Sequence, residues 1–331
     1  MDLVTGDGAW VPILVLWCAL SIDRLLGEPP ARLHPVVWMG RYLSWAGRRI
    51  APADHAPHGG PATRFLAGAL AWAAGACIVL WVAWAGQRLL EPLTPWIAVP
   101  LAGTLLKPML AWRMLASEVQ AVEQGLAVSL DVGRERLGRL VSRDVSGLDE
   151  HGVRESAIES LAENLSDSVV APLFWFVLAG LPGAALYRFA NTADAMWGYR
   201  GARGGRNWEW AGKFAARADD VLSWVPARVT ALLLALADRR WIIGLHSQAR
   251  RTPSPNGGWP MAAMAMLLGV RLGKPGVYLL NESGRLPAKA DTTRALRLAG
   301  VAVVLSALAG SLALWASDAT TDAAMTLPMP R

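Results

Sequence analysis

Charged side chains are missing from three long stretches of this chain, and this pattern sets the first expectation about its fold. The stretches are residues 65–85, 168–187 and 298–317. A helix of about 20 residues is about 30 Å long, which matches the hydrocarbon core of a bilayer. Each stretch is therefore predicted to form a helix embedded in a membrane.

Three further apolar segments carry one or two charges each. Residues 10–26 contain Asp23 and Arg24 near their end, residues 95–112 contain Lys107, and residues 221–237 contain Arg228. Together with the uncharged stretches they predict an all-α, polytopic integral membrane protein with about four to six transmembrane helices. Cytoplasmic helical loops are expected to connect them.

The distribution of arginine predicts the topology and one unusual segment. The N-terminal tail is acidic and residues 27–64 are rich in arginine, which places the tail outside and the loop inside. A crossing by residues 168–187 would carry the following basic stretch outside. Gly180, Pro182 and Gly183 lie in the middle of that segment, and such residues break helices and form turns. We therefore predict a re-entrant helical hairpin.

Composition agrees with a membrane protein and narrows the function. Of the 331 residues, 53% are hydrophobic and 18% are charged, whereas soluble domains average about 25% charged residues. The net charge of +6 is assigned to cytoplasmic loops, with no nucleic-acid partner, because no recognition module is present. The N-terminal tail has no basic residue of the kind a signal peptide needs, so residues 10–26 are expected to remain as a helix. We expect one membrane-embedded domain over residues 1–331, with a cytoplasm-facing catalytic region at 116–295.

A row of acidic residues precedes the second uncharged stretch. Glu155, Glu159, Glu163 and Asp167 recur every four residues, so a helix would place them along one face, where like charges repel. Such a row is stable if it is fully solvated or if it binds a cation, and Mg²⁺ takes one or two carboxylates together with phosphate oxygens and water. The spacing leaves both interpretations open.

Two more polar clusters flank the membrane segments that follow. Asn191 and Asp194 come just after the expected hairpin, and Arg217, Asp219 and Asp220 come just before the next apolar segment. The second cluster is an ordinary ion pair at a helix start or part of a metal–phosphate site.

Four other features are candidates for binding or catalysis. Lys107 and Arg228 lie in apolar segments, where an ionisable group is costly and is expected to be functional, paired, or extended to the interface. Residues 254–260 (Ser-Pro-Asn-Gly-Gly-Trp-Pro) form a turn-rich loop containing Asn256, which offers backbone N–H groups to an anion. His34 is a weaker candidate. Residues 269–275 are too short between their glycines for a nucleotide-binding P-loop and lack its Ser or Thr, so we reject that motif.

Several of these residues belong to longer motifs. The motif residues are Asp23, Gly27, Pro29, His34, Pro35 and Gly40; Arg143, Asp144, Glu159, Glu163, Asn164 and Asp167; Asn191, Thr192, Asp194, Gly198 and Tyr199; Arg217, Asp219, Asp220 and Arg228; and Ser254, Asn256, Gly258, Trp259 and Pro260. Together these motifs resemble one known family, the adenosylcobinamide-phosphate synthase (CobD/CbiB) family of cobalamin biosynthesis, and they run in the family's order from about residue 20 to residue 280. Departures from the usual pattern occur at Glu28, Ser168, Ser223 and Lys274.

This resemblance implies an ATP-dependent ligase with Mg²⁺ as cofactor and ATP as co-substrate. It would join aminopropanol, or its O-phosphate, to a propionate carboxylate of adenosylcobyric acid. On that basis Mg²⁺ is expected at Glu159, Glu163, Asp167 and Asp194, and phosphate at Arg217 and Arg228. Asp219 or Asp220 is expected to act as the base and Lys107 as a further catalytic residue. Substrate is expected to contact Asn164, Asn191, Asn256, His34 and Asp23.

Other functions remain as alternatives. A transporter or binding protein for a corrinoid or other large anion would also have membrane spans and buried charge, but no paired inverted halves stand out in the sequence. A scaffold for late cobalamin enzymes is a third interpretation. The expected location is the cytoplasmic (inner) membrane, with the active site facing the cytoplasm. A homo-oligomer or an association with other late cobalamin enzymes is also expected as a candidate assembly.

Overall fold

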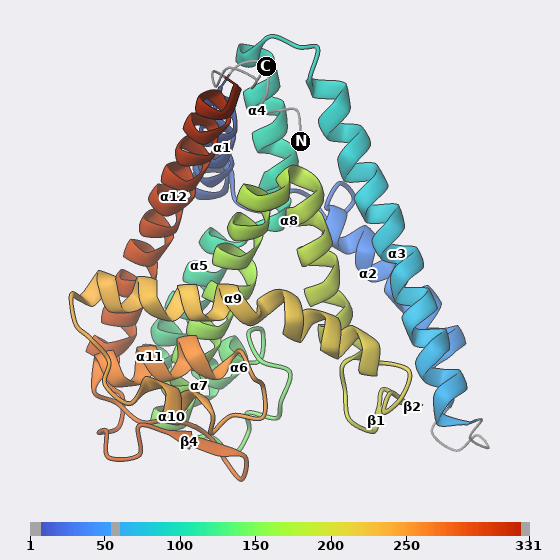
Figure 1. Cartoon of the computed structure of the whole chain (residues 1–331). Coiled ribbons are helices and arrows are strands. Elements are labelled where there is room, and N and C mark those ends of the chain that lie inside the picture. Colours follow the sequence, from blue (N-terminus) through green and yellow to red (C-terminus); the bar gives the residue numbers. More distant parts are fainter. Residues whose placement is uncertain (1–7, 54–59, 326–331) are drawn as a thin grey trace. The chain divides into compact units, whose positions relative to one another are not determined.

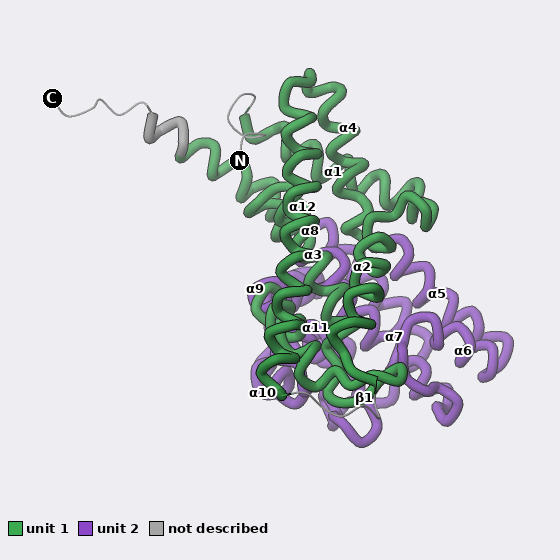
Figure 2. The backbone as a smooth tube through the Cα atoms, turned by 90° about the vertical axis from the view of Figure 1, so that its right-hand side faces the viewer, with its two compact units in different colours: residues 1–110, 172–222, 307–331 green, residues 111–171, 223–306 purple. Residues whose placement is uncertain are grey.

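The computed structural model describes residues 8–53 and 60–325, and nearly all of its regular structure is helical. The chain divides into two compact units, shown in different colours in Figure 2. Unit 1 contains residues 1–110, 172–222 and 307–331, and unit 2 contains residues 111–171 and 223–306. The expected all-α class is confirmed.

Unit 1 is built from the N-terminal helices, a helical hairpin and the last turns of the C-terminal helix. Its elements are α1 (Trp10–Leu26), α2 (Pro35–Ile50), α3 (Pro61–Leu90), α4 (Pro95–Leu106), the short 3₁₀ helix η1 (Lys107–Met109), nearly all of α8 (Ala171–Trp197), strands β1 (Ala202–Arg203) and β2 (Arg206–Asn207), the start of α9 (Lys213–Asp238), and the end of α12 (Lys289–Met325).

Unit 2 contains shorter helices and one small hairpin. Its elements are α5 (Trp112–Val128), α6 (Leu130–Leu137), α7 (Glu150–Leu165), the π-helical turn η2 (Ser166–Val170), most of α9, α10 (Leu245–Ala249), α11 (Gly258–Leu268), strands β3 (Leu272–Lys274) and β4 (Tyr278–Leu280), and the start of α12.

Among the described residues, four helical stretches are long and apolar enough to cross a membrane. They are Pro61–Leu90, Glu150–Trp197, Lys213–Asp238 and Lys289–Thr320. Each of the three uncharged stretches lies inside one of them, which confirms the polytopic membrane architecture predicted from the sequence. The bounds of α1 also coincide with the expected segment 10–26.

The expected segment 95–112 is broken in the structure. Helix α4 ends at Leu106, and the chain continues through η1 before α5 starts at Trp112. Pro108 explains the break, because proline lacks the N–H that would continue the helical hydrogen bonds. At 12 residues, α4 is about 18 Å long, which is shorter than the bilayer core.

Helix α8 is a hairpin, as the sequence predicted. Ala179 (φ −143°, ψ 18°) and Gly180 (φ 63°, ψ −154°) leave the helical conformation, and the ribbon reverses direction there in Figure 1. The backbone N–H of Leu181, freed by the turn, donates to Oε1 of the buried Gln87 from α3 at 3.1 Å. A break at membrane depth requires such internal partners. The 48-residue stretch Glu150–Trp197 is therefore not one straight span.

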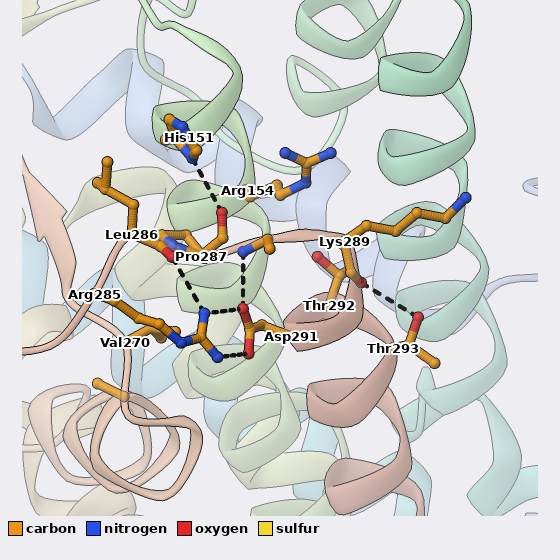
Figure 3. A network of polar contacts seen from close by, with 12 residues as sticks. His151, Arg154, Val270, Arg285, Leu286, Pro287, Lys289, Asp291, Thr292 and Thr293 are labelled. Carbon is orange, nitrogen blue, oxygen red and sulfur yellow. Dashed lines mark hydrogen bonds and ion pairs between the residues drawn. The ribbon is translucent and has the colours of Figure 1, made fainter.

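A polar network holds the start of α12 in unit 2 (Figure 3). Arg285 donates to both carboxylate oxygens of Asp291 at 2.6 Å, and the N–H of Ala288 donates to the same carboxylate at 2.8 Å. The ring of His151, in the first turn of α7, lies 3.1 Å from the carbonyl oxygen of Pro287. These contacts fix the first turn of α7 and the first turn of α12 against residues 285–288, the segment that leads into α12.

Helix α7 is also anchored through its buried arginine. Arg154 forms a bidentate pair with Glu123 of α5 at 2.8–3.1 Å, and Glu123 accepts a further hydrogen bond from Thr292 of α12 at 3.0 Å. Bidentate pairs fix orientation as well as distance. The position of α7 in unit 2 is thus set on two sides.

Candidate functional site

Helix α7 carries most of the acidic row and is largely buried. It begins at a defined point because the side chain of Asp149 accepts a hydrogen bond from the N–H of Gly152 at 2.7 Å, which is the usual N-cap arrangement. Glu155 is 8% exposed and Glu159 is 4% exposed. A solvated acidic face therefore does not describe these two residues.

Basic residues from distant segments offset the buried carboxylates. Nη2 of Arg143 lies 3.2 Å from Glu159 and 2.5 Å from the hydroxyl of Ser156. Nε of Arg271 lies 3.4 Å from Glu155. Buried charges are stable only when paired in this way, and the sequence spacing alone gave no indication of either partner.

A polar cavity of about 200 Å³ opens beside this row, and we call it the α7 pocket. It lies between the loop before α7, α7 itself and the β3–β4 hairpin, all within unit 2. Oε1 of Glu159 is buried and has no hydrogen-bond partner among the described residues. The residues that line the pocket are Leu140, Val141, Ser142, Arg143, Ser156, Glu159, Ser160, Glu163, Asn164, Lys274 and Tyr278.

Lys274 and Tyr278 were not expected from the sequence as site residues. They face each other across the β3–β4 ladder, one on each side of a tight turn. Cross-strand partners of this kind present their side chains on the same face of a hairpin. Pro275 and Gly276 mark the turn in the sequence, but no sequence spacing links the lysine beside them to α7.

The electrostatics of the pocket keep Tyr278 protonated. Burial raises the pKa of its hydroxyl, and the charges of Glu159 and Glu163 raise it further. The hydroxyl lies 3.7 Å from Sδ of Met261. Tyr278 is therefore a hydrogen-bond donor in the α7 pocket at any physiological pH.

The loop at residues 254–260 packs closely against Glu163. A Cβ added at Gly257 would lie 3.0 Å from Oε1 of Glu163, so a larger residue there would displace the carboxylate by a few tenths of an ångström. The hydroxyl of Ser254 accepts hydrogen bonds from the N–H groups of Asn256 and Gly257 at 3.2 and 3.1 Å, which shapes the turn.

Arg228 holds this loop in place. Its Nη1 donates to Oδ1 of Asn256 at 3.2 Å and to the carbonyl oxygen of Trp224 at 2.6 Å. Its guanidinium also stacks against the rings of Trp224 and Trp259, with centroid distances of 4.1 and 4.6 Å. The sequence left Arg228 either functional, paired with other groups, or extended to the interface. Its hydrogen bonds and ring contacts match a paired arginine.

The remaining residues of the acidic row have different surroundings. Asn164 lines the α7 pocket and donates to the carbonyl oxygen of Ser160 at 2.9 Å. Asp167 lies in η2 and is not among the residues that line the pocket. Within the described residues no group of three or more His, Cys, Asp or Glu side chains is arranged to hold a metal ion. Glu159 and Glu163 together still match the one or two carboxylates that Mg²⁺ takes when phosphate and water complete its shell.

The other predicted acidic residues lie in unit 1. Nδ2 of Asn191 lies 3.5 Å from Oδ1 of Asp219, so these two predicted residues do meet. Asp194 packs against Gly198, where an added Cβ would overlap its carboxylate. Asp220 lies within the electrostatic reach of Arg200.

Arg217 also lies in unit 1, and it is more exposed than the neighbouring Asp219 and Asp220. It lies in the first turns of α9 and is exposed. An exposed guanidinium is accessible to a phosphate from solution, and the phosphate-binding role expected from the sequence stays a prediction.

A second charged group in unit 1 contains Asp23, Glu28, His34 and Lys107, which we call the Lys107 cluster. Nζ of Lys107 lies 2.7 Å from Glu28 and 3.4 Å from Asp23. Nδ1 of His34 accepts from the N–H of Val36 at the start of α2, so its Nε2 carries the proton that it shares with Glu28 at 3.0 Å. The side chains of Lys107 and Asp23 are 3% and 1% exposed. The cluster ties the end of α1, the start of α2 and η1 together.

The sequence matches the model of the CobD/Cbib protein family over residues 16–306. The chain belongs to the CobD/CbiB family. It is 45% identical over 297 residues to the cobalamin biosynthesis protein CobD of Chromobacterium violaceum, covering 86% of this chain and 91% of that protein. It is 37% identical over 310 residues to the cobalamin biosynthesis protein CobD of Brucella suis, covering 85% and 90%. No solved structure matches this chain. The family resemblance inferred from short sequence motifs is thus confirmed over most of the sequence.

Proposed function

We propose that this member of the CobD/CbiB family is a membrane enzyme of cobalamin biosynthesis that forms an amide bond with consumption of ATP. The acid would be a propionate carboxylate of adenosylcobyric acid, and the amine would be aminopropanol or its O-phosphate. The names of the relatives support a role in cobalamin biosynthesis. The specific reaction rests on the family resemblance and on the chemistry of the α7 pocket.

The observation that carries the proposal is the mixture of charges in that pocket. Glu159 and Glu163 lie beside Arg143 and Lys274 in one cavity of about 200 Å³. Small-molecule sites commonly measure about 300–1,000 Å³, so this cavity suits a phosphate group better than a whole corrinoid. Carboxylates with basic residues are the combination that phosphoryl transfer from ATP requires.

The reaction needs two steps with a balanced exchange of groups. An oxygen of the propionate carboxylate attacks the γ-phosphorus of ATP, and ADP leaves, which produces an acyl phosphate. The amine nitrogen then attacks the acyl carbon, inorganic phosphate leaves, and a base takes the proton released from nitrogen. The activation is necessary because a carboxylate oxygen is otherwise too poor a leaving group.

The residues of the α7 pocket supply the parts for the first step. Arg143 and Lys274 would contact the phosphate oxygens, and the Tyr278 hydroxyl would donate a hydrogen bond to them. Glu159 and Glu163 would hold Mg²⁺, which would neutralise charge on the transferred phosphoryl group. The buried, unpartnered Oε1 of Glu159 fits such an ion.

For the aspartates of unit 1 the roles rest on the family resemblance alone. Asp219 or Asp220 is proposed as the base that accepts the proton from the amine, and Asn191 lies 3.5 Å from Asp219 within the same unit. Asp194 as a further metal ligand and Arg217 as a phosphate contact also remain proposals. We expect the protein in the cytoplasmic membrane with this chemistry on the cytoplasmic side, where ATP is available.

An oxygen-labelling experiment tests the proposed activation. Purified protein in detergent is supplied with ATP, Mg²⁺, either amine, and adenosylcobyric acid carrying ¹⁸O in its carboxylate. The proposal predicts an amide product of the expected mass and one ¹⁸O atom in the released inorganic phosphate. Label found only in AMP, or product formed without ATP, would show that the carboxylate is not activated by γ-phosphoryl transfer. ATP-independent corrinoid uptake by vesicles without product would favour the transporter instead.

A further inference from the structure

A second cavity of unit 2 lies at the C-terminal end of α9 and measures about 300 Å³. The side chains around it are apolar along the helix and basic or aromatic where the helix ends. They are Leu232, Ala235, Leu236, Arg239, Arg240 and Trp241. None of these residues belongs to the α7 pocket or to the unit 1 groups described above.

The depth of this cavity in the bilayer can be inferred from the contact between the end of α9 and α12. Asp238, the last residue of α9, accepts two hydrogen bonds from Arg294 at 2.8 and 2.9 Å, and Figure 1 shows the end of α9 beside the first turns of α12. Arg294 lies four residues before the uncharged run 298–317, which is about 6 Å along the helix axis. The end of α9 therefore lies where α12 passes from its charged turns into its membrane-spanning run.

The charges at this end of α9 are not balanced within the described residues. Arg239 and Arg240 are exposed. Arg240 lies 3.8 Å from the carboxylate of Asp238, which is also paired with Arg294 at 2.8 Å. Arg239 forms no ion pair with any described residue. The surplus positive charge favours an anion at this position.

The backbone at Arg239 adds an independent indication. The N–H of Arg239 bonds to Leu236 and the N–H of Arg240 bonds to Ala235, each at 3.1 Å, which is the pattern that closes a helix with a left-handed residue. Arg239 occupies that left-handed position with φ 56°, where glycine is the usual residue because it has no Cβ. An arginine at a position that favours glycine indicates that its side chain is needed there.

The apolar surroundings indicate what kind of anion this cavity would bind. Leu232 and Leu236 are 46% and 54% exposed, and Trp241 and Ile243 are 87% and 91% exposed. Arginine and tryptophan at the end of an apolar helix are typical of the interface between lipid and water. Hydrated phosphate alone would leave these apolar surfaces uncovered.

We propose that this cavity binds an anionic phospholipid. Its acyl chain would lie against Leu232 and Leu236, and its phosphate would contact Arg239 and Arg240. The indole of Trp241 would lie at the level of the headgroup. The site would anchor the end of α9 at the membrane surface and is independent of the proposed amide-forming reaction.

Native mass spectrometry of the full chain in detergent tests this proposal. The protein is titrated with phosphatidylglycerol and, separately, with phosphatidylcholine of the same acyl chains. We expect tighter binding of phosphatidylglycerol to the natural protein. In the double variant R239G/R240Q this binding should weaken by about tenfold or more, since each arginine near a membrane surface contributes about one order of magnitude or slightly less. Glycine at position 239 suits the left-handed backbone, so the variant should remain folded.

The matched control is R136Q/R139Q, which removes two positive charges from the end of α6 and the turn after it, where no residue lines the cavity. This control should keep the preference for phosphatidylglycerol. Equal affinity for the two lipids in the natural protein, or unchanged binding in R239G/R240Q, would overturn the proposal. Displacement of the lipid by inorganic phosphate at millimolar concentration would show a phosphate site instead of a lipid site and would also overturn it.

Discussion

The Lys107 cluster of unit 1 and the α7 pocket of unit 2 contain the same types of charged side chains but differ in how these are enclosed. In the Lys107 cluster, Lys107 and Asp23 are almost completely buried and paired, and Glu28 bonds to both Lys107 and His34. In the α7 pocket, Glu159 and Glu163 line a cavity of about 200 Å³ beside Arg143 and Lys274. Buried carboxylate oxygens without a hydrogen-bond partner occur in both places, at Glu28 and at Glu159, so the cavity is what distinguishes the two.

This difference separates two roles for buried charge. A closed set of ion pairs fixes the geometry of the chain, whereas charges around a cavity can interact with a ligand. We therefore predict that changes in the Lys107 cluster affect mainly stability, and that changes in the α7 pocket affect mainly activity. The role of Lys107 as a catalytic residue, expected from its place in the sequence, would then be indirect.

The largest effect on stability is predicted for Lys107→Met. It leaves the carboxylates of Asp23 and Glu28 without their cation, and removal of one member of a buried pair costs about 3–5 kcal/mol. The thermal unfolding midpoint in detergent should fall clearly. Lys289→Met makes the same chemical change at an exposed position and should leave the midpoint unchanged. Equal midpoints for both variants would show that the cluster does not hold unit 1 together.

Lys274→Met is predicted to have the opposite profile. It removes one cation from the α7 pocket at an exposed turn, so folding should be unaffected. Loss of one group that stabilises the transition state costs about 100-fold in kcat. Steady-state product formation and thermal unfolding measured together would check this, and a lowered midpoint with normal kcat would contradict it.

Gly257→Ala should have a smaller effect on activity. The added Cβ would press on the Glu163 carboxylate from 3.0 Å, and small displacements of reacting groups reduce rates by up to about 100-fold. We expect about a tenfold loss of kcat. Gly147→Ala is the control, since a Cβ at Gly147 meets nothing within 4 Å. A normal rate in Gly257→Ala would mean that the position of Glu163 is not critical.

The smallest effect is predicted for the pH dependence of stability. Burial alone would raise the pKa of Glu28, but hydrogen bonds from His34 and Lys107, and then their charges, lower it below its ordinary value of 4.5. The ionised form is thus favoured by folding, and the stability it contributes is present above about pH 4.5 and is lost as the pH falls further. Unfolding midpoints between pH 6 and pH 3 should fall more steeply for the natural protein than for Glu28→Gln. Parallel curves would contradict this.

The sequence predicted most of the membrane architecture because local patterns determine it. The absence of charge in 65–85 and 298–317 is sufficient for a spanning helix, and Gly180 is sufficient for the turn in α8. The segment 95–112 was predicted less well. The apolar character of this segment continues past Pro108, where the helix is broken. Hydropathy averaged over a window does not detect the single backbone N–H that proline lacks.

The candidate site was predicted only in part because its members come from distant segments. The row through Glu159 and Glu163 is visible as a helical period. Arg143 and Lys274 reach it only through the fold, and no spacing rule links position 274 to position 159. Arg228 illustrates the same limit, since its stacking between Trp224 and Trp259 depends on a loop that lies about 30 residues further along the chain.

The most direct test of the central claim, that the α7 pocket carries the chemistry, is the rate of product formation by Glu163→Gln. The variant keeps the size of the side chain and removes its charge, so we predict at least about a 100-fold loss of ATP- and Mg²⁺-dependent amide product with an unchanged unfolding midpoint. Glu135→Gln, at a side chain 70% exposed in α6, should react at the natural rate. A natural rate in Glu163→Gln would contradict the assignment of this pocket.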